Sequence, residues 1–558
     1  MNVVLAKGNT HFLCLDRLSK YYDGKEHPEW TKNWNDYSDF GDRVDLEKVI
    51  SDIDNIWGKI NIQKCKFNGC NHYYQCGHIR LREKRKENKS VIVTNHDQLI
   101  ANARNIEGSR RPLFPSDTQM IVVDEAHNLE EKARNALTET WSFGEINSIL
   151  RKTDSYLQRS EDYEGNRIRK KKIENLLSQF FQKLQSHCEK EVLQFEKVGH
   201  ETQRFNIPIM EHILLEELEL ELKSYSISLQ LVEIVGDEFD NIIDSLEDLI
   251  IFFATFAVAE DKIFWLEMTN LKSKIITLHS VPKEMDEIIN RYFFSQNKPP
   301  MILTSGTISQ PGADKYEQYE YILRTLGIDW LTESQISLSE PKLSPFDYKQ
   351  NALLYVPGNL PHPKETNSFR REAMSEIIKL LTLTEGRSMI LFTSKSDMQF
   401  VYTQLKEKNL SWSLFVQQEG SSQEAVKKKF LEDEHSILLS TGIFWEGIDI
   451  PGSSLSNLII FKLPFPVPDP ILEYKASRSL NGFSEVYLPE MLIKLRQGLG
   501  RLIRKENDRG IATILDSRIS SVQNKNYRDN VIDSLPFRNI TEDFEVVKEF
   551  VRDVLKFK

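Results

Sequence analysis

Residues 121–127 form the string IVVDEAH, in which a short run of apolar, β-branched residues ends directly in two carboxylates. Such a run is typical of a buried parallel strand whose carboxyl end carries Asp124 and Glu125. Similar runs recur at residues 301–303, 389–392, 437–439, 458–461 and 511–515, and we expect each to be a strand. Helical patterning separates the last four, which predicts an α/β fold with a parallel sheet.

The bulk properties narrow the class of protein. With 558 residues the chain is too long for one ordinary core, so we expect two domains with insertions. No apolar run approaches the roughly 20 residues of a membrane span, and the string MNVVLAKGNTHF lacks the pattern of a secretory signal, so we expect a cytoplasmic protein without a membrane partner. The net charge of −11 does not favour a protein that coats nucleic acid, so any DNA contact must be local.

The segment 131–260 differs in composition, since it is rich in Glu, Leu, Lys and Gln. Apolar residues recur in it at helical spacing, which predicts a helical insertion packed on itself. These residues are Ile242, Ile243, Leu246, Leu249, Ile250 and Phe253.

Two motifs carry candidate chemistry. In the first, Asp124 and Glu125 follow a strand, as in a Walker B motif, where one carboxylate serves Mg²⁺ and its neighbour polarises water. In the second, RQGLGRLIR at residues 496–504, Arg501 and Arg504 are three apart, and we expect them on one helical face, from which they can reach a phosphate. The alternatives are a solvated acidic turn and a basic surface helix.

The chain has five cysteines, too few for a disulfide scaffold. Cys65, Cys70 and Cys76 lie close together in sequence, Cys14 lies upstream, and the isolated Cys188 is interpreted as an ordinary cysteine.

Nine strings, in order, resemble superfamily 2 helicases of the DinG/XPD group, and DinG proteins in particular. They are KGNTHFLC at 7–14, VTNHDQL at 93–99, DEAH at 124–127, TSGT at 304–307, SPFDY at 344–348, LFTS at 391–394, FWEGIDIPG at 444–452, LPFPVPDP at 463–470 and QGLGRLIR at 497–504.

The resemblance implies two RecA-like parallel-sheet motor domains, the first incomplete. Residues 1–130 would form the incomplete first domain with an iron–sulfur insertion at about 14–90, and residues 131–260 a helical arch. The chain would return to the first domain over 261–340 and form the second domain over 341–558.

The resemblance also implies a [4Fe–4S] cluster held by Cys14, Cys65, Cys70 and Cys76, because four thiolates suit such a cluster. Zinc is the alternative, although the paired CxxC knuckles typical of zinc sites are missing from the sequence. Incidental thiols are a third possibility.

Residue roles follow from the same resemblance. Asp124 and Glu125 would serve Mg²⁺ and water activation, and His127 would couple hydrolysis to movement. The residues expected to line the nucleotide cleft or contact its phosphates are Gly447, Asp449, Gln497, Arg501 and Arg504. Candidate nucleic-acid contacts are Ser305, Thr307, Thr393 and Ser394, with Arg80, Arg82, Arg85 and Lys86 from a basic cluster. Gly306 stands where alanine is usual.

A second basic cluster, Arg167 with Arg169 to Lys172, falls in the expected arch. Each cluster by itself is more often a solvated face than a binding site. Because both fall in the two insertions that would form a gateway for single-stranded DNA, we expect at least one to contact phosphates.

The implied activity is ATP-dependent translocation on single-stranded DNA, 5′ to 3′, in repair or replication, with forked or displacement-loop DNA as substrates. Yet neither Gly–Lys pair, at 24–25 or 58–59, belongs to a GxxxxGK[ST] phosphate-binding loop. We expect this loop to be supplied by another chain, or by an upstream start or frame that this sequence does not show. The chain alone should expose unpaired strand edges and apolar faces. The alternatives are a non-catalytic single-stranded DNA-binding or partner protein, or a truncated fragment.

Overall fold

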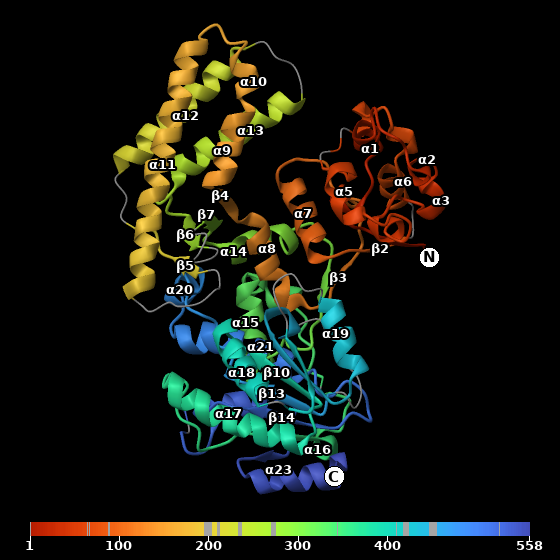
Figure 1. Ribbon diagram of the computed structural model, residues 1–558, viewed down its shortest axis with the longest axis vertical. Helices are drawn as coiled ribbons and strands as arrows, with labels where there is room; N and C mark the ends of the chain where they lie inside the picture. The colour runs from red at the N-terminus through yellow and green to blue at the C-terminus, as the bar shows by residue number, and fades with distance from the viewer. Residues whose placement is uncertain are drawn as a thin grey trace. The chain divides into compact units, whose positions relative to one another are not determined.

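The computed structural model describes residues 2–557 except 64, 66, 87–89, 195–202, 209–211, 233–236, 269–274, 343, 409, 417–422, 446–454 and 524. The chain divides into two compact units (Figure 1). The first contains residues 1–137, 285–305 and 325–331, and the second contains residues 138–284, 306–324 and 332–558.

A seven-stranded parallel sheet, ordered β11-β12-β10-β13-β14-β9-β15, forms the centre of the second unit. Its strands are β9 (Ala352–Tyr355), β10 (Ser388–Phe392), β11 (Ser413–Val416), β12 (Ser436–Thr441), β13 (Asn457–Ile460), β14 (Gly510–Ile514) and β15 (Ile540–Thr541). Every residue of β9, β10, β13 and β14 is buried, because helices cover both faces, as is usual for parallel sheets. This confirms the expected α/β fold with a parallel sheet.

The covering helices supply two separate cores. Side chains of α16 (Tyr348–Asn351), α19 (Gln423–Glu432), α21 (Leu488–Leu499) and α22 (Arg528–Ser534) pack in one. Those of α17 (Thr366–Leu383), α18 (Lys395–Glu407) and α23 (Phe544–Phe550) pack in the other. Helices α15 (Lys315–Thr325) and α20 (Pro470–Ser477) complete this part of the second unit.

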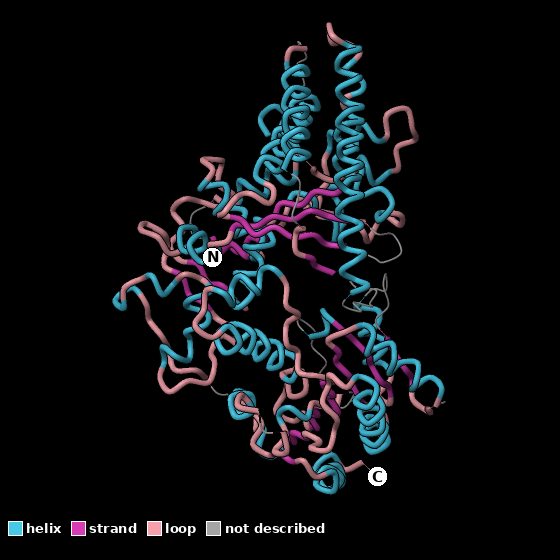
Figure 2. Tube along the Cα trace, turned by 90° about the vertical axis from the view of Figure 1, so that its left-hand side faces the viewer, coloured by secondary structure: helices cyan, strands magenta, loops and turns pink. Residues whose placement is uncertain are grey.

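Residues 138–284 of the second unit combine helices with an antiparallel sheet ordered β4-β7-β6-β5, from which the long helices extend in Figure 2. The strands are β4 (Glu139–Ser142), β5 (Gln203–Phe205), β6 (Lys262–Met268) and β7 (Ile276–Pro282). The helices are α9 (Phe143–Lys152), α10 (Asp154–Leu157), α11 (Tyr163–Gln194), α12 (His212–Gln230) and α13 (Asp237–Thr255). Because β4 pairs with β7, this part continues past the expected boundary at residue 260.

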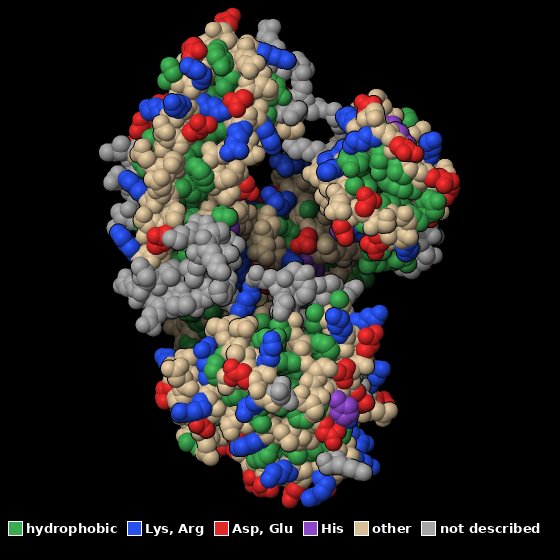
Figure 3. All heavy atoms as spheres, viewed as in Figure 1, with side chains coloured by type: hydrophobic (Ala, Val, Ile, Leu, Met, Phe, Trp, Pro, Cys, Tyr) green, Lys and Arg blue, Asp and Glu red, His purple; other side chains and the backbone are tan. Residues whose placement is uncertain are grey.

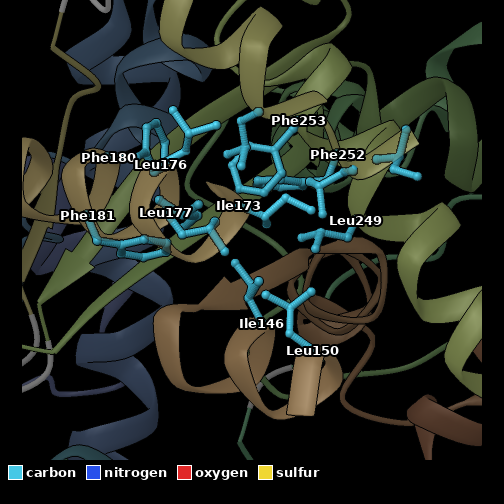
Figure 4. Packing of buried hydrophobic residues seen from close by; sticks show 14 of the residues in the cluster. Ile146, Leu150, Ile173, Leu176, Leu177, Phe180, Phe181, Leu249, Phe252 and Phe253 are labelled. Atoms are coloured by element: carbon cyan, nitrogen blue, oxygen red, sulfur yellow. The ribbon is translucent and has the colours of Figure 1, made fainter. Parts of the chain in front are cut away.

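The apolar stripe expected at helical spacing lies on α13, and all six of its residues are buried in the core of this helical part (Figure 4). Phe180 of α11 is fully buried there, with its ring centroid 5.7 Å from that of Phe253 and 5.9 Å from that of Phe256.

Replacing Phe180 by alanine should leave a cavity in this core and destabilise the helical part by about 3–5 kcal/mol. Amide hydrogen exchange along α11 and α13 measures the change. Leu220→Ala is the matched control, since Leu220 is 62% exposed and its truncation should shift stability by less than about 0.5 kcal/mol. Equal exchange in both variants would show that Phe180 does not hold this core.

The first unit contains two short parallel ribbons among its described residues. Strand β1 (Asn2–Leu5) pairs with β2 (Ser90–Val93), and β3 (Ile121–Val123) pairs with β8 (Met301–Leu303). Between β1 and β2 lie α1 (Leu15–Tyr21), α2 (Glu29–Lys32), α3 (Trp34–Tyr37), α4 (Arg43–Leu46), α5 (Ile53–Ile60) and α6 (Gly77–Lys84). Helices α7 (His96–Glu107), α8 (Leu129–Leu137) and α14 (Met285–Phe293) follow. No helix in the described part of the chain has the length and apolar character needed to cross a membrane.

Candidate active site

The carboxyl ends of β3 and β8 meet, because the two strands are parallel neighbours. Thr304, directly after β8, donates its hydroxyl hydrogen to Asp124 Oδ1 at 2.8 Å. The backbone closes the same corner, since Thr304 N–H donates to the Val123 carbonyl and Ala126 N–H donates to the Thr304 carbonyl. Asp124 is exposed, so its carboxylate is both oriented and accessible to a cation.

Glu125 occupies a left-handed backbone conformation with φ of 48°, which is uncommon for a residue with a side chain. The Ser305 hydroxyl donates to Glu125 Oε2 at 3.2 Å, and His127 Nδ1 lies 2.7 Å from the same serine oxygen. Because the serine proton points to Glu125, His127 Nδ1–H is the donor to Ser305. The Glu125 side chain remains 60% exposed, whereas that of His127 is 3% exposed.

Thus Asp124, Glu125, His127 and Ser305 come together in the first unit, as two carboxylates at a strand end joined to a buried histidine. Thr307 is buried. Position 306 does not require glycine for steric reasons, because a Cβ added to Gly306 would meet no atom within 4 Å.

The second unit places the arginines differently from the expectation. Helix α21 ends at Leu499 with Gly500 as its C-cap, so Arg501 and Arg504 lie beyond the helix, and the prediction that they share a helical face is wrong. Arg501 is buried and its Nη2 donates to the Trp445 carbonyl at 3.1 Å. Arg504 is exposed. Gln497 lies in the last turn of α21 and is half-buried.

Two residues of the same motif escaped the sequence analysis. Gly498 packs against the Trp445 ring, where a Cβ would come within 2.8 Å of two ring carbons. Arg496 donates to the carbonyl oxygens of Ser309 and Gly306, the latter at 3.1 Å, and burial lowers its pKa. A glycine inside a helix could have signalled the first contact, but no local pattern distinguishes Arg496 from its neighbours.

Ser394 caps helix α18 by accepting from the Asp397 N–H at 3.2 Å, and its hydroxyl donates to Asp397 Oδ2. Burial by itself raises the pKa of Asp397, but Lys462 and Arg370, each 2.8 Å away, outweigh burial and hold that pKa below its usual value. Thr393 lies beside this cap. Gly447 and Asp449 fall outside the described residues.

The four upstream cysteines gather in one region. Cys14 caps α1 and Cys76 caps α6, and Cys14, Cys65 and Cys76 share a small apolar core with Phe12. Burial raises the pKa of the Cys14 and Cys76 thiols, while backbone N–H groups at the start of α1 and α6 act in the opposite direction and favour thiolates. Cys14 interacts electrostatically with Cys70, and Cys76 with Cys65 and Cys14, so the four side chains lie near one another.

Within the described residues, no group of three or more His, Cys, Asp or Glu side chains converges on one point as ligands of a single ion would. The four thiolates of a [4Fe–4S] cluster each bind a different iron, so they need not converge on one point. Neighbouring thiols, two of them at helix N-termini, fit that chemistry. The cluster itself stays a prediction.

The first basic cluster is partly buried. Arg82 donates to the Pro112 carbonyl at 3.1 Å and lies over the Phe67 ring, and burial lowers the pKa of Arg85 to about 10. Both side chains are buried, whereas Arg80 and Lys86 are exposed. Of the four candidates in this cluster, Arg80 and Lys86 are therefore the accessible ones, and Lys86 forms an ion pair with Glu83 at 2.6 Å.

The second basic cluster is paired with acidic residues of its own region. The ion pairs are Arg167–Glu164, Arg169–Glu221, Lys170–Asp154 and Lys172–Glu217. Over α11 and α12, Figure 3 accordingly shows basic and acidic side chains interspersed rather than a continuous positive stripe. These pairs weaken the positive potential that phosphate binding needs.

Known proteins resemble this chain in both sequence and fold. Residues 377–540 match the family model of a helicase C-terminal domain. The chain is 26% identical over 593 residues to the ATP-dependent DNA helicase YoaA of Haemophilus influenzae, covering 99% of this chain and 84% of that protein. It is 30% identical over 551 residues to the ATP-dependent DNA helicase DinG of Photobacterium profundum, covering 90% and 76%. A solved XPD helicase matches 97% of this chain and 86% of its own with a TM-score of 0.54 at 17% identity, which establishes the fold.

Proposed function

Because this chain belongs to the DinG family of ATP-dependent DNA helicases, we propose that it is a DNA-dependent ATPase that moves 5′ to 3′ along single-stranded DNA. The observation that carries this proposal is the corner formed by Asp124, Glu125, His127 and Ser305. Carboxylates held at a strand end, one accessible to a cation and one to water, suit phosphoryl transfer.

In the proposed reaction, Asp124, oriented by the hydrogen bond from Thr304, would hold Mg²⁺, which would offset the charge of the nucleotide phosphates. Glu125 accepts a proton from the attacking water, whose oxygen forms a bond to the γ-phosphorus of ATP as the bond to the ADP oxygen breaks. The Ser305 hydroxyl links Glu125 to the buried His127, so a movement of residues 304–307 would reorient the carboxylate. This link supports a role for His127 and Ser305 in coupling hydrolysis to movement.

Phosphate binding is the step for which these 558 residues offer no GxxxxGK[ST] string. We propose that this loop lies outside these 558 residues, either on another chain or upstream of them. A second candidate function is a single-stranded DNA-binding or partner protein that keeps the helicase frame without turning over ATP. The retention of Glu125 in a strained conformation speaks for the enzyme, because a binding protein has no use for that strain.

The four thiols of Cys14, Cys65, Cys70 and Cys76 would hold a [4Fe–4S] cluster in the segment about residues 14–90. When bound, the cluster would cross-link this segment, whose described helices are short and pack in two small apolar cores. Arg80 and Lys86 at its surface could then contact the DNA backbone.

Replacing Cys76 by serine should abolish the cluster. Protein purified without oxygen is expected to contain about four irons per chain and to absorb broadly near 400 nm, and both signals should fall to background in the variant. Cys188→Ser is the control, because Cys188 is buried in the core of the other unit and should leave the iron content unchanged. Stoichiometric zinc in place of iron would establish the alternative metal.

The activity is tested by strand displacement on duplexes with a single-stranded tail at one end. The assay contains Mg²⁺, ATP and a polypeptide that carries a GxxxxGK[ST] loop, called the phosphate-loop polypeptide. We expect strand displacement on duplexes with a 5′ tail and on forks, and little on duplexes with a 3′ tail. Displacement from the 3′ tail alone would reverse the polarity. Binding to the tail without displacement, and without ATP turnover, would support the binding-protein alternative.

A further inference from the structure

Trp445 joins two stretches of the second unit that are far apart in the sequence. Its indole Nε1–H donates to the Phe392 carbonyl at 3.0 Å, and Phe392 is the last residue of β10. The backbone carbonyl of Trp445 accepts in turn from Arg501 Nη2 at 3.1 Å. One residue therefore holds the end of a strand with its side chain and an arginine beyond α21 with its backbone.

The ring of Trp445 is also closely packed. Trp445 is 1% exposed and belongs to the core that contains Leu391, Leu495 and Leu499. Gly498 lies so near that a Cβ added there would come within 2.8 Å of the ring atoms Cε3 and Cζ3. Because interiors are packed as densely as organic crystals, a shift of this ring needs a shift of its neighbours. A displacement of the ring would therefore displace the last turn of α21.

The two stretches that Trp445 joins carry candidate contacts of different kinds. Thr393 and Ser394, the candidate DNA contacts, directly follow Phe392. Arg501 is a candidate contact for nucleotide phosphates. The hydrogen bond to the Phe392 carbonyl is buried, and leaving its donor or acceptor without a partner would cost free energy. The indole should therefore follow this carbonyl when the backbone at the end of β10 moves.

We propose that Trp445 is a positioning residue through which single-stranded DNA at Thr393 or Ser394 controls the position of Arg501. The proposal rests on the proposed function, in which the chain binds single-stranded DNA and hydrolyses ATP. DNA that shifts the backbone after β10 would move the Phe392 carbonyl and, with it, the indole. Because Arg501 donates to the Trp445 carbonyl, its guanidinium would shift as well. Trp445 itself would contact neither DNA nor nucleotide.

The test is amide hydrogen exchange in the full chain, with and without a single-stranded oligonucleotide and in the absence of ATP. In the wild type, DNA should slow exchange in residues 393–395 and also in residues 499–504. Trp445→Phe keeps a buried aromatic ring and the backbone carbonyl but removes the indole N–H. In this variant the slowing should persist in residues 393–395 and should fall by at least about fivefold in residues 499–504, the lower end of usual couplings between sites.

Two further variants accompany this measurement. Trp330→Phe is the matched control, because Trp330 is 53% exposed in the first unit and its replacement should leave both effects of DNA unchanged. Gly498→Ala keeps the indole N–H but displaces the ring, so the effect of DNA on residues 499–504 should again be lost. The unfolding transition of each variant is measured on the same preparation, and Gly498→Ala replaces Trp445→Phe if the latter does not fold.

ATP hydrolysis supplies a readout that a purely structural role would not produce. With the phosphate-loop polypeptide present, Trp445→Phe should keep the hydrolysis rate measured without DNA and should reduce the stimulation by DNA at least about fivefold. An equal loss of both rates would overturn the proposal. So would an effect of DNA on residues 499–504 that persists in Trp445→Phe, or that is missing in the wild type.

These outcomes are separate from those of the proposed function. An effect of DNA on residues 499–504 that needs Trp445, without ATP hydrolysis, would refute the enzyme and leave the positioning role in place. DNA-stimulated hydrolysis that is unchanged in Trp445→Phe would do the reverse.

Discussion

Replacing Glu125 by glutamine is expected to lower the rate of DNA-stimulated ATP hydrolysis by about 10²- to 10⁴-fold, the usual contribution of a general base. Glutamine keeps the size of the side chain and can still accept from Ser305, but it cannot take a proton from water. The rate of phosphate release, measured with Mg²⁺, single-stranded DNA and the phosphate-loop polypeptide, reports the loss.

Glu131→Gln provides the matched control for this substitution. Glu131 is exposed on α8, six residues further along the chain, so its loss should leave the rate within about twofold. DNA binding should be unchanged in both variants. A Glu125→Gln enzyme that keeps more than a tenth of the wild-type rate would remove Glu125 from the role of base.

Replacing Arg504 by alanine should lower the hydrolysis rate by about 10³- to 10⁵-fold, the range found for arginines that stabilise charge on the transferred phosphoryl group. Its exposure leaves the guanidinium accessible to a nucleotide, so thermal stability should hardly change. The hydrolysis rate and the unfolding midpoint are measured on the same preparation, with Lys505→Ala, an exposed neighbour, as the control.

Arg501 should behave differently, because it is buried and donates to the Trp445 carbonyl. Arg501→Ala is expected to lower stability by about 1–3 kcal/mol as well as activity, since the carbonyl loses a charged donor. If Arg501→Ala instead left stability unchanged and Arg504→Ala were active, the two arginines would have exchanged roles.

Much of the second unit could be predicted because its strands are continuous apolar runs. The runs at 389–392, 437–439, 458–461 and 511–515 each fall within, or one residue beyond, a strand of the parallel sheet. Strands β11 and β15 carry weaker patterns, being half-exposed at the edges of the sheet. The strand β6 was missed because its burial alternates only in part, with Trp265 and Leu266 both buried, and because its partner strand β7 lies outside any local window.

The candidate site, too, could be predicted from the sequence only in part. The carboxylates at the end of β3 were predictable, since a strand followed by two acids fixes their position. The link through Ser305 was not, because it joins residues 180 positions apart in the chain. The basic cluster at residues 80–86 indicated a charged surface, yet Arg82 and Arg85 are buried, which depends on where Phe67 and Pro112 fold against them.

The exposed strands of the first unit were also beyond a sequence-based prediction. Val122 and Ile302 are half-exposed on one side of a two-stranded ribbon. Neither residue differs in type from the buried valines and isoleucines of the second sheet, so only the structure shows which of them are exposed.

The most direct test of the proposed function measures phosphate release and strand separation together on one 5′-tailed duplex, with the phosphate-loop polypeptide present. We predict that both signals appear together, that both need ATP, and that both vanish in the Glu125→Gln variant. Tight binding of the single-stranded tail, with neither phosphate release nor strand separation in the wild-type chain, would contradict the proposed function.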